Sequence, residues 1–122
     1  MEEWKNLKIL VADDDPFLSL MVSKYLEPTK IQITRAENGK EAVQLCKNKQ
    51  FDIVLMNIQM PVMDGFKATI EIRGFNKDIA IIAQTTYHYD PVRFFTGGFT
   101  DYIFTPFNPE DLILIIKKNI KH

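Results

Sequence analysis

The chain has 122 residues, a formal net charge of -1 and an ordinary composition, with 46% hydrophobic and 25% charged residues. This length is typical of one domain with one hydrophobic core, and we take residues 1–122 as that domain. The balanced charge leaves no broad basic face for nucleic acid, and a single cysteine, Cys46, excludes an internal disulfide and a cysteine-cluster zinc site. No apolar run approaches the about 20 residues of a membrane span, and the acidic start Met1–Glu3 is unlike a signal peptide, so we expect a cytoplasmic protein.

The first two predicted elements are a buried strand and a helix. Residues 8–12 form a nearly continuous apolar run, the pattern of a strand buried on both faces. Asp15 and Pro16 then predict a helix start, with an N-cap followed by proline at the first helical position. The helix carries one apolar stripe at spacings of three and four residues, formed by Leu18, Met21, Val22 and Tyr25. Pro28 ends it.

The same alternation of strand and helix continues to the end of the chain. Residues 31–36 alternate apolar and polar side chains, which predicts a less buried edge strand. Apolar runs at residues 53–56, 80–83 and 102–104 predict three further strands. After a turn at Asn38-Gly39, a second helix is predicted by the inner face Ala42, Leu45 and Cys46, and a third by Phe66 with Ile70. A short fourth helix, Pro91–Thr96, follows Asp90. The last helix starts at the cap Asn108 and carries Lys117, Lys118 and Lys121 at its far end. This pattern predicts an α/β fold, a doubly wound five-stranded parallel sheet with helices on both faces.

Polar residues follow the ends of the predicted strands, where the ligand site of such a sheet lies. They are Asp13, Asp14, Asp15, Asn57, Thr85, Thr86 and Thr105. Asp15 is interpreted as a helix cap, whereas the adjacent Asp13 and Asp14 repel each other unless a cation is present. Because Mg²⁺ prefers carboxylate and phosphate oxygens, the pattern favours a magnesium-dependent phosphoryl site over the simpler alternative, a solvated turn.

Five segments add a more specific pattern through their order and spacing. They are residues 9–16 (ILVADDDP), 60–65 (MPVMDG) and 81–85, the pair Asp101-Tyr102, and residues 105–107. Together they make the chain resemble, over essentially its whole length, the receiver domain of two-component response regulators, which is free-standing or part of a hybrid sensor kinase. The resemblance implies a flavodoxin-like sheet of strand order 2-1-3-4-5. It also implies phosphoryl transfer from a histidine kinase to an aspartate ending the third strand, with Mg²⁺ on an acidic pair and a hydroxyl and a lysine on the phosphoryl oxygens.

The resemblance assigns each of these roles to a position in this chain. The positions are Asp13 and Asp14 for the acidic pair, Asn57 for the phosphoacceptor, Thr85 for the hydroxyl, Tyr102 for the aromatic switch, Thr105 for the lysine, and Pro61, Asp64, Gly65 and Pro106 for the loops around the site. In the family the peptide bond before the last of these prolines is cis, and we expect the same here.

Two of these positions depart from the family pattern. The amide of Asn57 is uncharged and a poor nucleophile, so an acyl phosphate cannot form on it. Thr105 cannot supply the cation that neutralises a phosphoryl group. Replacing one acid and one base leaves the formal charge of the site unchanged. This compensation favours a pocket that has kept its structure over one that is decaying at random. We therefore expect a degenerate receiver that is no enzyme and requires no cofactor, in which Mg²⁺ or Ca²⁺ binds at Asp13, Asp14 and Asn57 weakly or not at all and phosphoryl donors have no effect.

Aromatic residues crowd the segment 87–107, which in the family contacts partners. They are Tyr87, Tyr89, Phe94, Phe95, Phe99, Tyr102, Phe104 and Phe107. Exposed rings here would form a docking face for a histidine kinase, an output domain or a second copy of the chain; in the alternative interpretation, Phe94, Phe99 and Phe104 belong to the core. His88 stands alone and is interpreted as structural or solvent-facing.

Two other functions were weighed. The first is a phosphoaccepting regulator with an engineered Asp-to-Asn change at position 57, but the simultaneous loss of the lysine at Thr105 favours natural degeneration. The second is a phosphatase of the haloacid dehalogenase kind, with Asp13 as nucleophile and Asp15 as acid. That resemblance is poor, because Phe17 and Thr105 stand where such enzymes have a small β-branched residue and a lysine.

Overall fold

The computed structural model describes residues 3–86 and 89–120, in which five strands alternate with five α-helices. The strands are β1 (Lys8–Ala12), β2 (Gln32–Ala36), β3 (Ile53–Asn57), β4 (Ala80–Thr85) and β5 (Asp101–Phe104). The helices are α1 (Pro16–Leu26), α2 (Gly39–Asn48), α3 (Gly65–Arg73), α4 (Pro91–Thr96) and α5 (Pro109–Asn119), and a 3-10 turn, η1 (Glu27–Thr29), follows α1. Tyr87 and His88 lie outside the described residues, so the predictions made for them remain open.

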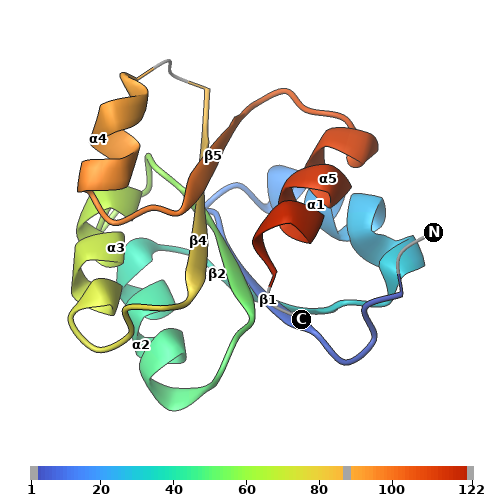
Figure 1. The fold of residues 1–122 in the computed structure, drawn as a ribbon, viewed down its shortest axis with the longest axis horizontal. Helices are drawn as coiled ribbons and strands as arrows, with labels where there is room; N and C mark the ends of the chain where they lie inside the picture. Colours follow the sequence, from blue (N-terminus) through green and yellow to red (C-terminus); the bar gives the residue numbers. More distant parts are fainter. Residues whose placement is uncertain (1–2, 87–88, 121–122) are drawn as a thin grey trace.

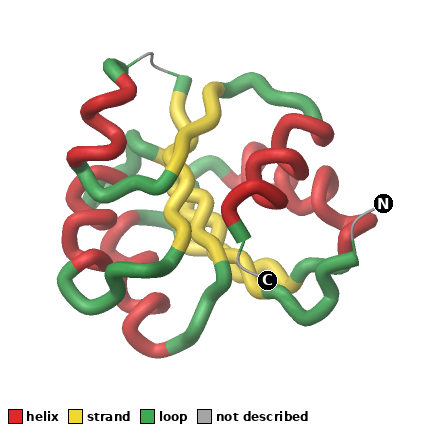
Figure 2. The backbone as a smooth tube through the Cα atoms, viewed as in Figure 1, coloured by secondary structure: helices red, strands yellow, loops and turns green. Residues whose placement is uncertain are grey.

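All neighbouring strands pair in parallel, in the order β2-β1-β3-β4-β5. Helices α1 and α5 cover one face of the sheet, and α2, α3 and α4 cover the other (Figure 1). Figure 2 shows the strands as one layer between the two groups of helices. The predicted fold class and strand order are therefore confirmed.

The strands β1, β3 and β4 are mostly apolar, as expected where helices cover both faces of a sheet. Four of the five residues of β1 and β3 and all six of β4 are buried, whereas the edge strand β2 buries only Ala36. One side of the sheet packs Val22 and Leu26 of α1 against Leu112 and Ile116 of α5. The helices on the opposite side bury Ala42, Val43, Ala68, Ile72 and Phe94.

Each helix begins at a polar residue that accepts a backbone N–H of the first turn. The caps are Asp15, Asn38, Asp64, Asp90 and Asn108. This confirms the predicted starts at Asp15, Asp90 and Asn108, each followed by proline. It corrects the prediction of a turn at Asn38-Gly39, since the Asn38 Oδ1 accepts the amide of Glu41 at 2.8 Å and the helix starts at once.

Helix α3 lies where Phe66 and Ile70 predicted it, but Ile70 is 61% exposed. The residues that α3 buries are Gly65, Ala68, Thr69 and Ile72. Among the helices of residues 3–86 and 89–120, none has the length and apolar character that crossing a bilayer requires.

Candidate functional site

The carboxyl ends of β1, β3, β4 and β5 bring the predicted site residues together. They surround a cavity of about 240 Å³ lined by Asp13, Asp14, Asp15, Leu18, Asn57, Gln59, Gln84, Thr85, Thr86 and Thr105. The parallel strands explain this convergence, because residues that follow each strand emerge at the same edge. The sequence predicted seven of these positions; Leu18 was placed only on a helix stripe, and the two glutamines were not singled out.

Asp13 directly follows β1 and is buried, and both of its carboxylate oxygens accept hydrogen bonds. Its Oδ1 accepts the amide of Asp15 at 2.9 Å, and its Oδ2 accepts Nε2 of Gln84, which is also buried, at 2.9 Å. Burial raises the pKa of the Asp13 carboxyl above its ordinary value of 3.8, while these two hydrogen bonds oppose the rise. Asp13 is therefore a fixed, desolvated carboxylate.

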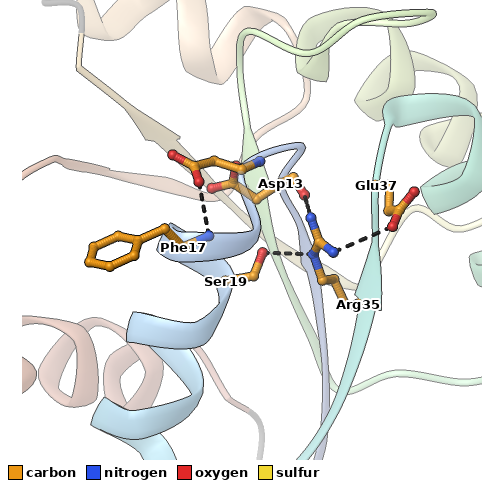
Figure 3. A network of polar contacts seen from close by, with 6 residues as sticks. Asp13, Phe17, Ser19, Arg35 and Glu37 are labelled. Atoms are coloured by element: carbon orange, nitrogen blue, oxygen red, sulfur yellow. Dashed lines mark hydrogen bonds and ion pairs between the residues drawn. The ribbon is translucent and has the colours of Figure 1, made fainter.

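An arginine ties the same turn to the edge strand (Figure 3). The Arg35 guanidinium donates to the backbone oxygen of Asp13 at 3.0 Å and to the Ser19 hydroxyl at 2.8 Å. It also forms an ion pair with Glu37 at 3.4 Å. Because Arg35 reaches the backbone of Asp13 and not its carboxylate, it orders the turn.

Asn57 ends β3, beside the second aspartate of the pair. Its Nδ2 donates to the backbone oxygen of Gln59 at 2.9 Å and, more weakly, to Asp14 Oδ1 at 3.4 Å. The Asp14 side of this contact is exposed to solvent, in contrast to buried Asp13. The chain thus places a hydrogen-bond donor at the end of β3, facing Asp14.

Two threonines complete the rim on the β4 and β5 side. Thr85 is buried, and its backbone oxygen accepts the amide of Thr105 at 2.9 Å. The Thr105 hydroxyl is buried and has no hydrogen-bond partner among the described residues. The bond between Thr105 and Pro106 is cis, as predicted. The β5 side of the cavity therefore carries the short neutral side chain of Thr105.

The loop after β3 brings the chain back against the site. Asp64 caps α3 by accepting the amide of Lys67 at 2.9 Å, and the amide of Gly65 donates to Ile58 O at 2.7 Å. A Cβ on Gly65 would collide with the backbone oxygen of Asn57, so only glycine allows this approach. Pro61, in contrast, is exposed.

The aromatic segment turns out to be largely internal. Phe94 and Phe99 are buried on the α3 side of the sheet, whereas Phe107 is buried on the opposite side against Tyr25. Tyr102, at the aromatic switch position, is half-buried and stacks on Phe94 with a ring separation of 5.0 Å. Most of the rings thus fill the core, as the alternative interpretation held for Phe94 and Phe99.

What remains exposed on this face is a small apolar patch on α4. Phe95 is 52% exposed and Val92 is 63% exposed. Tyr89 and Phe104 are half-buried and pack against the core. Among the rings of this segment in the described residues, Phe95 is the exposed one, and it lies in a helix of only six residues.

One feature of the sequence points to a role for Gln84. Gln84 interrupts the apolar run Ala80–Ala83 in a strand buried on both faces, and a buried amide needs a partner. No such signal marks Arg35 or Gln59, because their contacts depend on the pairing of β1 with β2 and on the course of the loop after β3.

The oxygens of Asp13, Asp14 and Asn57 are the groups that could hold a metal ion. In the described part of the chain, residues 3–86 and 89–120, no group of three or more His, Cys, Asp or Glu side chains is placed to do so. A donor nitrogen occupies the side of Asn57 that faces Asp14. The residues present are thus a poor fit to Mg²⁺, which requires oxygen ligands in octahedral geometry.

The chain is similar to known proteins over nearly all of its length. Residues 9–117 match the family model described as the response regulator receiver domain. The chain is 34% identical to the transcriptional regulatory protein ResD of Bacillus subtilis, over 96% of the chain and 49% of ResD. It is also 34% identical to the sensor histidine kinase CheAY of Helicobacter pylori, over 93% of the chain and 15% of the kinase. It therefore spans half or less of the length of these relatives.

Solved structures of other proteins are similar to this chain as well. The chemotaxis protein CheY4 of Vibrio cholerae superimposes with a TM-score of 0.87 at 28% identity, covering 93% of this chain and 98% of that one. A co-crystal structure of the Saccharomyces cerevisiae histidine phosphotransfer signaling protein Ypd1 and the receiver domain of its downstream response regulator Ssk1 matches with a TM-score of 0.86 at 26% identity, over 93% of this chain and 88% of that one. Receiver domains are regulatory modules that interact with histidine kinases, phosphotransfer proteins and output domains. The fold, the family match over residues 9–117 and the site at the strand ends together show that this chain belongs to the response regulator receiver domain family of two-component phosphorelays.

Proposed function

We propose that this receiver domain is a regulatory and interaction module that works without phosphorylation. The observation that carries the proposal is the side chain at the end of β3, where the Asn57 nitrogen donates to Gln59 O and Asp14 Oδ1. A nitrogen whose protons are engaged with two acceptors offers no nucleophile to a phosphoryl donor. Thr105 adds no positive charge to offset a phosphoryl group that approached.

Without a covalent switch, the conformation of such a module is biased only by what binds to it. The packing of Tyr102 on Phe94 supports a single resting arrangement of α4 and β5, since the two rings stack at 5.0 Å. The domain would then present one fixed surface to a histidine kinase, an output domain or a second copy of the chain. We place that surface on Val92 and Phe95, the exposed apolar residues of α4.

The first experiment follows backbone amide resonances while beryllofluoride, a phosphoryl mimic, is added with Mg²⁺. We expect the resonances of Thr85 and Tyr102 to stay in place, because neither the acceptor nor the lysine is available to hold the mimic. Saturable shifts at both residues would refute the proposal.

The second experiment tests the surface. Binding to phosphotransfer domains from the same organism is measured by calorimetry for Phe95→Ser and for the matched control Ile70→Ser, whose side chain is exposed to 61% on α3. We expect the first substitution to weaken binding and the second to leave it unchanged. Equal affinities for the two variants would remove α4 from the interface.

A further inference from the structure

We propose that two carboxamide groups prevent divalent cations from binding at this site, and that the amide of Gln84 contributes most to this effect. The inference rests on the proposed function only in taking Asn57 as the native residue. It concerns metal binding, which can be measured separately from phosphorylation. Gln84 has no role in the resemblance that identified the site; its role comes from its contact alone.

The first group is the amide of Gln84, which holds Asp13. Both side chains are at least 98% buried, with 2% and 1% of their surface exposed, and Gln84 Nε2 lies 2.9 Å from Asp13 Oδ2. The other Asp13 oxygen already accepts the amide of Asp15. An ionised carboxylate only accepts hydrogen bonds, so the Gln84 atom facing it must be the donor nitrogen. The positive end of an N–H dipole thus lies against Oδ2, one of the two Asp13 oxygens that could bind a cation.

The second group is the amide of Asn57, which faces Asp14. Its two partners, the Gln59 carbonyl and the Asp14 carboxylate, are both acceptors, which again fixes the nitrogen on this side. The donor stands between two oxygens of the kind that Mg²⁺ prefers as ligands. A metal ion shared by these oxygens would have to displace it.

The two amides differ in how much free energy it costs to break their hydrogen bonds to the aspartates. The Asn57 contact with Asp14 is long, at 3.4 Å, and lies at the exposed rim, so this amide can turn away at little cost. The Gln84 amide is buried, and losing Asp13 would leave a desolvated donor without its acceptor. Gln84 is therefore the stronger barrier, and restoring an aspartate at position 57 alone does not restore a cation site.

The test measures Mg²⁺ binding by isothermal titration calorimetry and Mn²⁺ binding by the broadening of the Asp14 and Thr85 amide resonances. We expect the natural chain to show no saturable binding and Asn57→Asp to gain little. Adding Gln84→Met to Asn57→Asp should tighten binding by at least about tenfold, the equivalent of about 1.4 kcal/mol. The control adds Gln32→Met to Asn57→Asp. This exposed glutamine on β2 donates to Lys5 O at 2.9 Å, away from the acidic pair, and replacing it should leave the Mg²⁺ affinity of the Asn57→Asp protein unchanged.

Saturable Mg²⁺ binding by the natural chain would overturn the inference. So would an Asn57→Asp variant that binds as tightly as its combination with Gln84→Met. If the combined variant does not fold, Mg²⁺ binding by the Asn57→Asp protein still tests the inference, because tight binding by this protein would contradict the proposed role of Gln84. A natural chain that binds Mg²⁺ yet ignores beryllofluoride would refute this inference and leave the proposed function standing.

Discussion

At the scale of single residues, the character of the site follows from how each acid is surrounded. Asp13 is desolvated and held by Gln84 and by the amide of Asp15. Asp14, one position later, is exposed and has a single long contact to Asn57. Two adjacent carboxylates therefore differ in solvation, and the buried one, Asp13, bears the cost of desolvation.

The raised pKa of Asp13 makes a prediction about stability and pH. Because burial raises the pKa of this carboxyl above its ordinary value of 3.8, the folded chain holds the proton more tightly than the unfolded chain. The natural protein therefore loses stability, relative to Asp13→Asn, as the pH rises from below 3.8 through the folded-state pKa. Urea unfolding of both proteins at about pH 4 and about pH 7 measures this difference.

We expect Asp13→Asn to be the more stable protein at neutral pH and to lose that advantage in acid. The substitution removes the buried charge, keeps an oxygen for the amide of Asp15, and lets the Gln84 amide rotate to accept in place of donating. An advantage that stays constant with pH, or grows in acid, would show that Asp13 is not the group responsible.

At the scale of elements, α4 depends on its side chains. A helix of six residues is too short to persist on its propensity alone, so its position must come from packing. Phe94 is completely buried and has ring neighbours on α3 and β5, at 6.0 Å for Phe66 and 5.0 Å for Tyr102. The Arg93 guanidinium lies 4.4 Å from the centre of the Phe66 ring, and this cation-π contact adds a further link to α3.

Adjacent phenylalanines in this helix provide a matched pair. Phe94→Ala should cost about 3–5 kcal/mol of unfolding free energy, the usual cost of removing a fully buried ring. Phe95→Ala should cost less than about 1 kcal/mol, because that ring is half in solvent. Urea denaturation of the two variants gives both values. Similar losses in the two proteins would mean that Phe94 does not anchor α4.

At the scale of the whole molecule, the sequence predicted what depends on local signals and on topology. Asp15-Pro16 and Asn108-Pro109 mark helix starts because caps act within one turn. Asp13, Asn57 and Thr85 were expected at one edge because parallel strands end there. The sequence could not show that Gln84 holds Asp13, since these residues are 71 positions apart and their contact depends on the side-chain packing of three strands. Nor could it separate buried Phe94 from exposed Phe95, because one short helix gives no periodicity to compare.

The same scale explains how few residues the proposed change of function would need. The ends of β1, β3, β4 and β5 deliver side chains to the cavity, so a different residue at position 57 or 105 leaves the fold, the acidic pair and the surrounding loops in place. We infer that the domain keeps the shape that partners of this family recognise while it lacks the groups that receive a phosphoryl group. Its output would then follow the amount of protein and of partner, and not the state of a kinase.

The most direct test of this account is the intact mass of the protein after incubation with acetyl phosphate and Mg²⁺. A receiver that carries the family's aspartate and lysine is treated in the same tube and must gain about 80 Da, the mass of one phosphoryl group. We predict that the present chain gains nothing. An alkali-labile gain of about 80 Da that disappears in Asn57→Ala would contradict the account.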